Sequence, residues 1–143
     1  MATREIYQLT KSVWTPTISF VTPGDLSVVY SSRYGFYRVI DNVVDLWFNI
    51  ITSTFTHTTA SGTLTVSGAP YSATSETGNH NHGPLTWQGI TKAGYTQINA
   101  RIASTAVVSF PASGSGVSYS DVSAADTTTG VNLVLQGYLS YRK

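Results

Sequence analysis

Apolar and polar residues alternate with a period of two in segment after segment of this chain. Clusters of glycine, proline, asparagine and serine separate these segments. A period of two is that of a β-strand, whose successive side chains point to opposite faces of a sheet. No segment sustains the 3.6-residue period of a helix. The pattern predicts about eight to ten strands, over residues 17–21, 27–31, 36–39, 42–52, 63–67, 85–88, 95–103, 107–110, 117–120 and 131–141.

This succession of short strands predicts an all-β fold, a single antiparallel β-sandwich of the jelly-roll type covering residues 15–143. Residues 1–14 are expected to form an N-terminal arm or docking segment. Trp14, followed by Thr15-Pro16, marks the start of the folded domain in this interpretation.

Two of the predicted strands are apolar on both faces. One face of the fourth strand is plainly core, and its other face is half apolar around a tryptophan. The last strand repeats this arrangement. The core faces carry Val44, Leu46, Phe48 and Ile50 in the fourth strand, and Val131, Leu133, Leu135, Leu139 and Tyr141 in the last.

The second faces of these strands predict a subunit interface, since such surfaces combine an aromatic anchor with polar neighbours. The expected interface residues are Val43, Trp47, Ile51, Val134 and Tyr138. The alternative is that both strands are central and that a loop of the same chain covers their second face. The interface is favoured because few charged residues are present to keep such a surface soluble.

Composition narrows the possible functions. Charged residues make up 10% of the chain, with eight basic and seven acidic side chains, against about 25% in an ordinary domain. The bases are scattered singly, which argues against nucleic-acid binding. Absence of cysteine excludes thiolate chemistry, and the most apolar stretch, residues 43–51, is too short to insert into a membrane.

Candidate chemistry is sparse. His80 and His82 could chelate a metal, but only Glu76 and His57 could assist, without a motif spacing, so a solvated polar loop is expected. We predict no catalytic residues and no cofactor, because no close carboxylate pair and no nucleophile elbow occurs. Asp41-Asn42 between two apolar runs predicts a hairpin turn. Among the aromatics, Tyr71 and Trp87 are possible ligand-facing residues for a sugar.

Several segments resemble a family of phage virion domains found in tail fibres, tail tips and head decorations. In that family a hairpin of the pattern G-x-Y, two or three residues, G-N-x-V precedes a strand of the pattern G-x-L-x-I-x-G-L-P-F. This chain has Asp41 where glycine is usual, and Ala69 and Tyr71 where leucine and phenylalanine are usual. The resembling segments are Trp14–Phe20, Gly35–Val44, Gly62–Tyr71 and Gly89–Ile98.

The resemblance implies a homotrimeric jelly roll, similar in outline to the tumour-necrosis-factor type, on the surface of a virion. It implies no catalytic residue. A capsid decoration or cement protein is favoured, with Ile6, Tyr7, Leu9 and Trp14 as the residues that dock onto the particle. The alternatives are a tail-fibre or tail-tip receptor-binding head, which would contact a host surface glycan, and a carbohydrate-binding module of another context.

Overall fold

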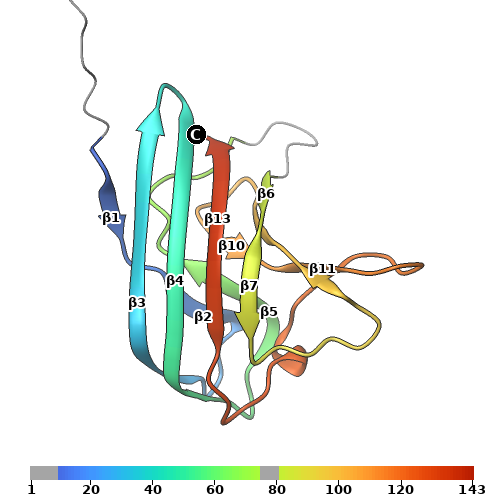
Figure 1. Ribbon diagram of the computed structural model, residues 1–143. Helices are drawn as coiled ribbons and strands as arrows, with labels where there is room; N and C mark the ends of the chain where they lie inside the picture. Colours follow the sequence, from blue (N-terminus) through green and yellow to red (C-terminus); the bar gives the residue numbers. More distant parts are fainter. Residues whose placement is uncertain (1–9, 75–80) are drawn as a thin grey trace, which may run out of the picture.

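The computed structural model describes residues 10–74 and 81–143 (Figure 1). In these residues the chain is all-β and its strands pair antiparallel; one turn of 3₁₀-helix, η1 (Ala124–Asp126), is the single helical element. The strands are β1 (Ser12–Trp14), β2 (Thr17–Thr22), β3 (Ser27–Ile40), β4 (Val43–Thr56), β5 (Ser61–Ser67), β6 (Asn81–Gly83), β7 (Leu85–Gln88), β8 (Gln97–Ile98), β9 (Ala100–Ile102), β10 (Val108–Ser109), β11 (Pro111–Ser113), β12 (Ser120–Asp121) and β13 (Val134–Arg142).

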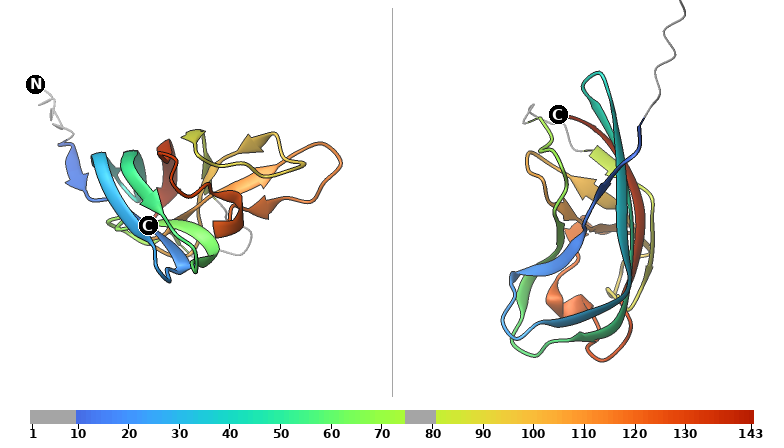
Figure 2. Two further views of the ribbon diagram at one scale, coloured as in Figure 1. Left: turned by 90° about the horizontal axis from the view of Figure 1, so that it is seen from below. Right: turned by 90° about the vertical axis from the view of Figure 1, so that its left-hand side faces the viewer.

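Two five-stranded sheets form the two layers of the fold, seen edge-on in Figure 2. The first sheet has the order β1-β3-β4-β13-β7, and the second has the order β2-β5-β10-β9-β6. A third, small sheet, β12-β11-β8, lies beside them. The inward side chains of both large sheets share one core, which includes Leu46 and Ile50 of the first sheet and Leu64, Val66 and Ile102 of the second.

The longest element is the β3–β4 hairpin, in which both strands run for 14 residues. Its two-residue turn is Asp41-Asn42, as predicted, with Ile40 paired to Val43. Asp41 adopts a φ of 54°, a conformation that aspartate tolerates in turns better than most residues. Two strands predicted over 27–31 and 36–39 are therefore one strand, β3, with irregular register near Tyr30.

One row across the inner side of the first sheet alternates large and small residues. The paired positions are Trp14 with Gly35, Gly35 with Phe48, Phe48 with Gly137, and Gly137 with Leu85. A β-carbon on Gly35 would run into the Trp14 indole, and one on Gly137 would run into the Phe48 ring. The two glycines therefore make room for the two aromatic rings of the core, which meet edge-to-face at 6.3 Å between centroids.

The position of Trp14 corrects the expectation that it belongs to a docking arm. Its side chain is buried in the core. Its indole Nε1 donates to the carbonyl oxygens of Phe36 (3.2 Å) and Trp47 (3.0 Å). The folded part of the chain thus includes β1, which pairs with β3. The other three expected docking residues, Ile6, Tyr7 and Leu9, lie outside the described residues.

Three short strands were not predicted from the alternation. β1 and β11 have three residues each, too few to show a period. β6 begins at Asn81, inside the stretch expected to be a solvated loop, and pairs with β9 so that His82 faces Arg101. Backbone pairing at a sheet edge, not side-chain pattern, makes this segment a strand.

We predict that Gly137→Ala lowers the free energy of unfolding by about 1–3 kcal/mol, because the added methyl overpacks the Phe48 ring. Urea unfolding at one fixed protein concentration measures it. Arg142→Ala, at an exposed position of the same strand, is the control. In a Phe48→Leu background the cost of Gly137→Ala should shrink. An unchanged cost in both backgrounds would contradict the packing role of the row.

Candidate functional site: the outer face of the first sheet

The solvent side of the first sheet carries a row of aromatic side chains at its centre. Phe36 of β3, Trp47 of β4 and Tyr138 of β13 are directly paired across the three strands, and we call them the aromatic row. The Trp47 and Tyr138 rings are 5.2 Å apart between centroids. Val13 of β1 extends the row at the sheet edge, where 75% of its surface is exposed. No described strand or loop crosses the outer side of the first sheet (Figure 2).

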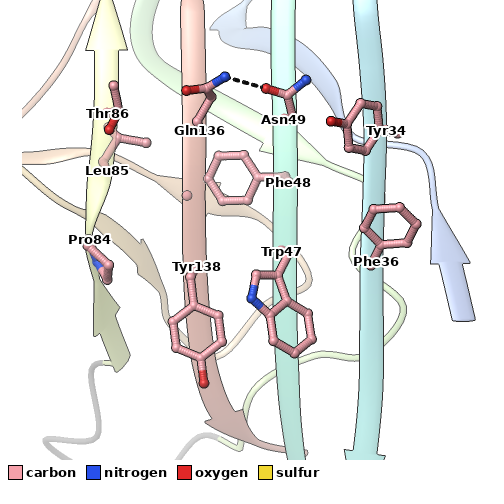
Figure 3. Close-up of a pocket in the computed structure, with 11 residues that line it drawn as sticks. Tyr34, Phe36, Trp47, Phe48, Asn49, Pro84, Leu85, Thr86, Gln136 and Tyr138 are labelled. Atoms are coloured by element: carbon pink, nitrogen blue, oxygen red, sulfur yellow. Dashed lines mark hydrogen bonds between the residues drawn. The ribbon is translucent and has the colours of Figure 1, made fainter. Parts of the chain in front are cut away.

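A hollow of about 330 Å³ runs along the aromatic row and the polar residues next to it (Figure 3). Its floor is the sheet itself, so it is broad and open to solvent. Side chains from four strands contribute to it, which makes it a property of the assembled sheet. The lining residues are Tyr34, Phe36, Trp47, Phe48, Asn49, Pro84, Leu85, Thr86, Gln136, Gly137 and Tyr138.

Next to the aromatic row lies a chain of hydrogen-bonded amides, which we call the amide ladder. Gln136 Nε2 donates to Asn49 Oδ1 at 2.6 Å, and Asn49 Nδ2 donates to Ser32 Oγ at 2.9 Å. Tyr34, half exposed, is paired with Asn49 on the same face. The ladder orients its amides, so its donors and acceptors are presented in fixed positions.

On the other side of the aromatic row is a charged group built around Asp45. Its carboxylate accepts hydrogen bonds from Arg38 Nε (2.7 Å) and from the Tyr138 hydroxyl (2.9 Å). Burial opposes ionisation and is the largest single effect on the pKa of Asp45. The hydrogen bonds from Arg38, Tyr138 and Ser140 together outweigh it and lower that pKa.

A second hollow, of about 340 Å³, adjoins the aromatic row at the β1 side and is lined by Lys11, Phe36, Arg38 and Trp47. Lys11 Nζ lies 3.4 Å from the centroid of the Phe36 ring, and Arg38 Cζ lies 5.5 Å from that of Trp47. Both are cation–π contacts. The two cations thus border the aromatic row and leave the faces of its rings partly covered by their own chain.

The five residues expected at a subunit interface all lie on this outer face. Trp47 and Tyr138 form its aromatic centre, and Val43 pairs with Arg142 at the turn end of the hairpin. Ile51 pairs with Val134 at the other end. The alternative to a subunit interface was a loop of the same chain covering this face, and no such loop is present among the residues that the structure describes. Association through the face stays a prediction.

The solvent side of the second sheet is different in kind. Its paired row runs through Ser19, Thr65, Ser109, Arg101 and His82 and contains no aromatic residue. Its inward neighbours, such as Ile18 and Val66, are buried. The paired outer row of the second sheet thus has no counterpart of the aromatic row.

The two aromatics expected to face a ligand pack against the core instead. Trp87 pairs with Leu135, and both point to the inner side of the first sheet. Tyr71 contacts the Tyr37 ring at 6.0 Å between centroids, and its carbonyl accepts the Tyr141 hydroxyl at 2.9 Å. Burial raises the pKa of Tyr141 to about 12. This corrects the expectation that Tyr71 and Trp87 are presented for stacking.

Sequence reasoning left Phe36, Arg38, Asn49 and Gln136 out of the expected site. For Phe36 and Arg38, the hairpin turn gave a signal that could have placed them. Counting back from the Asp41-Asn42 turn places Phe36 opposite Trp47, and Arg38 opposite Asp45. No comparable signal places β13 beside β4, because a long stretch of chain separates them.

The structure offers no support for a metal centre in the part of the chain that it describes, where no cluster of three or more potential ligands occurs. The His57 ring packs against two aromatic rings of the core. Its centroid lies 5.1 Å from that of Phe20 and 5.3 Å from that of Phe55. Its Nε2 is 2.8 Å from the Thr127 hydroxyl. Glu76 and His80 lie outside the described residues.

Comparisons of the chain with protein-family models, with curated proteins and with solved structures found no match. Over residues 10–74 and 81–143, no helix has the length and apolar character needed to cross a membrane.

We predict that Asp45→Asn destabilises the fold at pH 7 and that the difference from the unmodified chain disappears in acid. The folded pKa of Asp45 is below its unfolded value of about 3.9. Its contribution is therefore present above that value and lost as the pH falls through the folded pKa. Urea unfolding from pH 7 into strong acid measures the difference.

Tyr138→Phe provides the matched test, because it removes one hydrogen bond to the carboxylate and keeps the ring. It should raise the folded pKa of Asp45 and move the loss of stability to higher pH. An Asp45→Asn difference that is the same at every pH would contradict the account.

Proposed function

We propose that this chain is a non-enzymatic structural protein of a phage virion that assembles as a homotrimer through the outer face of its first sheet. The aromatic row carries the proposal: three paired aromatic side chains lie at the centre of a sheet face that no described segment covers. Faces of this composition, with aromatic anchors inside a polar surround, are typical of protein–protein contacts.

A second copy of the chain is the partner that this face fits best. The face presents both signs of charge, in Arg38 and Asp45, and both amide donors and acceptors, in Asn49 and Gln136. In a ring of three copies, the donors and the cation of one copy can meet the acceptors and the carboxylate of the next copy, whose face carries the same groups. Only 10% of the chain is charged, so the rest of the surface gives little electrostatic protection against association.

Threefold order and the virion setting rest on the family resemblance of the segments around the hairpin and the Gly62–Tyr71 strand. In the jelly rolls of that outline, aromatic strands of one sheet line a threefold axis. The first sheet here offers such strands in β3, β4 and β13. We extend the proposal to a jelly-roll outline and to a position on the outside of the capsid, as a decoration or cement protein.

Trp47→Ala is expected to weaken assembly by about 30-fold or more, as removal of a central aromatic anchor does. Sedimentation velocity over a dilution series measures it. Tyr119→Ala is the control, since Tyr119 is 66% exposed but lies away from the aromatic row. Far-UV circular dichroism verifies that each variant folds.

A second variant tests the same face independently of whether the Trp47→Ala protein folds. Gln136 is exposed, so Gln136→Arg adds a like charge to every copy of the face without disturbing the core, and it too should lower the mass. If the Trp47→Ala and Gln136→Arg proteins both keep the full mass of the unmodified protein at low concentration, a different surface makes the contact.

The decoration role makes a separate prediction for the segment that precedes β1. Replacing Ile6, Tyr7 and Leu9 together by serine should abolish co-sedimentation with purified expanded capsids and leave the mass in solution unchanged. A triple variant with Thr3, Gln8 and Thr10 replaced by serine is the control. Undiminished capsid binding would exclude these three residues as the docking group. Adhesion to host cells instead of capsids would favour the receptor-binding alternative.

A further inference from the structure

A polar hollow of about 270 Å³ lies where the β6–β9 edge of the second sheet meets β11 of the small sheet. It shares no lining residue with the two hollows of the aromatic face. Its size suits a single small ring and is slightly below that of typical drug-sized pockets. The lining residues are His82, Asn99, Arg101, Pro111, Ser113 and Tyr119.

Among the lining residues, Arg101 has a guanidinium that hydrogen bonds within the chain hold in place. Arg101 Nε donates to Ser109 Oγ at 3.2 Å, and its Nη2 donates to both Asp121 oxygens at 3.1 and 2.8 Å. The Arg101 side chain is 14% exposed and the Asp121 side chain 27%. The arginine charge is therefore balanced locally, which disfavours a free anion as the ligand, while its N–H groups stay in fixed directions.

Two further lining residues, Asn99 and Ser113, also present polar groups to the hollow. Asn99 is oriented by Gln97, whose Nε2 donates to Asn99 Oδ1 at 3.0 Å. The backbone N–H of Asn99 donates to the carbonyl of Pro111 at 3.0 Å, which ties β11 to this wall. Ser113 adds a hydroxyl from the same strand. The wall thus offers both donors and acceptors without a net charge.

An exposed aromatic ring borders these polar groups. Tyr119 is 66% exposed, far more than the packed Tyr71. The loop before it is anchored, because the Tyr95 hydroxyl donates to the Ser118 carbonyl at 3.0 Å. The ring therefore has a supported position beside the hollow and an apolar face open to solvent.

We propose that this hollow binds one ring of a neutral carbohydrate. The Tyr119 ring would pack against the apolar C–H face of the sugar, and Asn99, Ser113 and the bound guanidinium would exchange hydrogen bonds with its hydroxyls. A neutral polyol matches the tyrosine ring and the amide, hydroxyl and guanidinium groups of the lining, whereas an anion meets the balanced Arg101–Asp121 pair and an apolar ligand would leave these polar groups unpaired. The site does not depend on self-association, because it lies away from the aromatic row.

Saturation-transfer NMR with the intact chain tests the site. The probes are the methyl glycosides of glucose, galactose, mannose and N-acetylglucosamine, each at up to about 20 mM, the weak range expected of one ring. At least one should bind. Tyr119→Ala should weaken that binding tenfold or more, whereas Tyr119→Phe should keep most of it. Val117→Ala, an exposed apolar residue of the same loop, is the control.

Binding of none of the four glycosides would overturn the proposal. So would a bound glycoside whose affinity is the same in the Tyr119→Ala and Val117→Ala proteins. The mass of each variant is measured in parallel. Loss of sugar binding with an unchanged mass supports this hollow as the site, and a simultaneous change in mass would place Tyr119 in the assembly and overturn the assignment.

Discussion

The alternating inner row of the first sheet determines what the sheet shows to solvent. Trp14 lies over Gly35, and Phe48 lies over Gly137, so two large rings enter the core at positions where the neighbouring strands have no side chain. Adjacent residues of a strand point to opposite sides. With Phe48 fixed inward, Trp47 and Asn49 must point outward. A slip of one residue would turn Asp45, Trp47 and Asn49 toward the core side of the sheet and expose the present core residues.

This constraint explains why the aromatic row and the amide ladder are held in fixed places. Trp14 adds a second restraint, because its indole N–H bonds to the carbonyls of Phe36 and Trp47, the backbone of the aromatic row itself. These restraints limit the freedom of the outer face before a partner binds, which lowers the entropic cost of binding. The second sheet, whose outer row is of serine, threonine, arginine and histidine, has no comparable apolar surface to cover.

Much of this architecture follows from patterns within single strands. Period-two alternation identifies the all-β class, the inward set around Leu46 and Ile50, and the outward position of Trp47. The turn at Asp41-Asn42 even sets which residue of β3 faces which residue of β4. These features are local, so one stretch of sequence is enough to state them.

The features that could not be predicted depend on contacts between distant segments. Pairing of β13 with β4 brings Gln136 to Asn49 across 87 positions of sequence. Trp14, which was expected to belong to the N-terminal arm, packs on Gly35 in the core. Residues Asn81–Gly83 form a strand because they pair with β9. In each of these pairs, neither segment carries a sequence pattern that identifies the other as its partner. The polar hollow beside Tyr119 arises in the same way, from the meeting of two sheets.

The central claim is that a second and a third copy of the chain cover the aromatic row. Light scattering of the purified, unmodified protein across a dilution series tests it most directly. The account predicts a mass of three 15.4 kDa chains that persists on dilution. A mass of one chain at every concentration would contradict it, and would mean that the aromatic row is stable in contact with water.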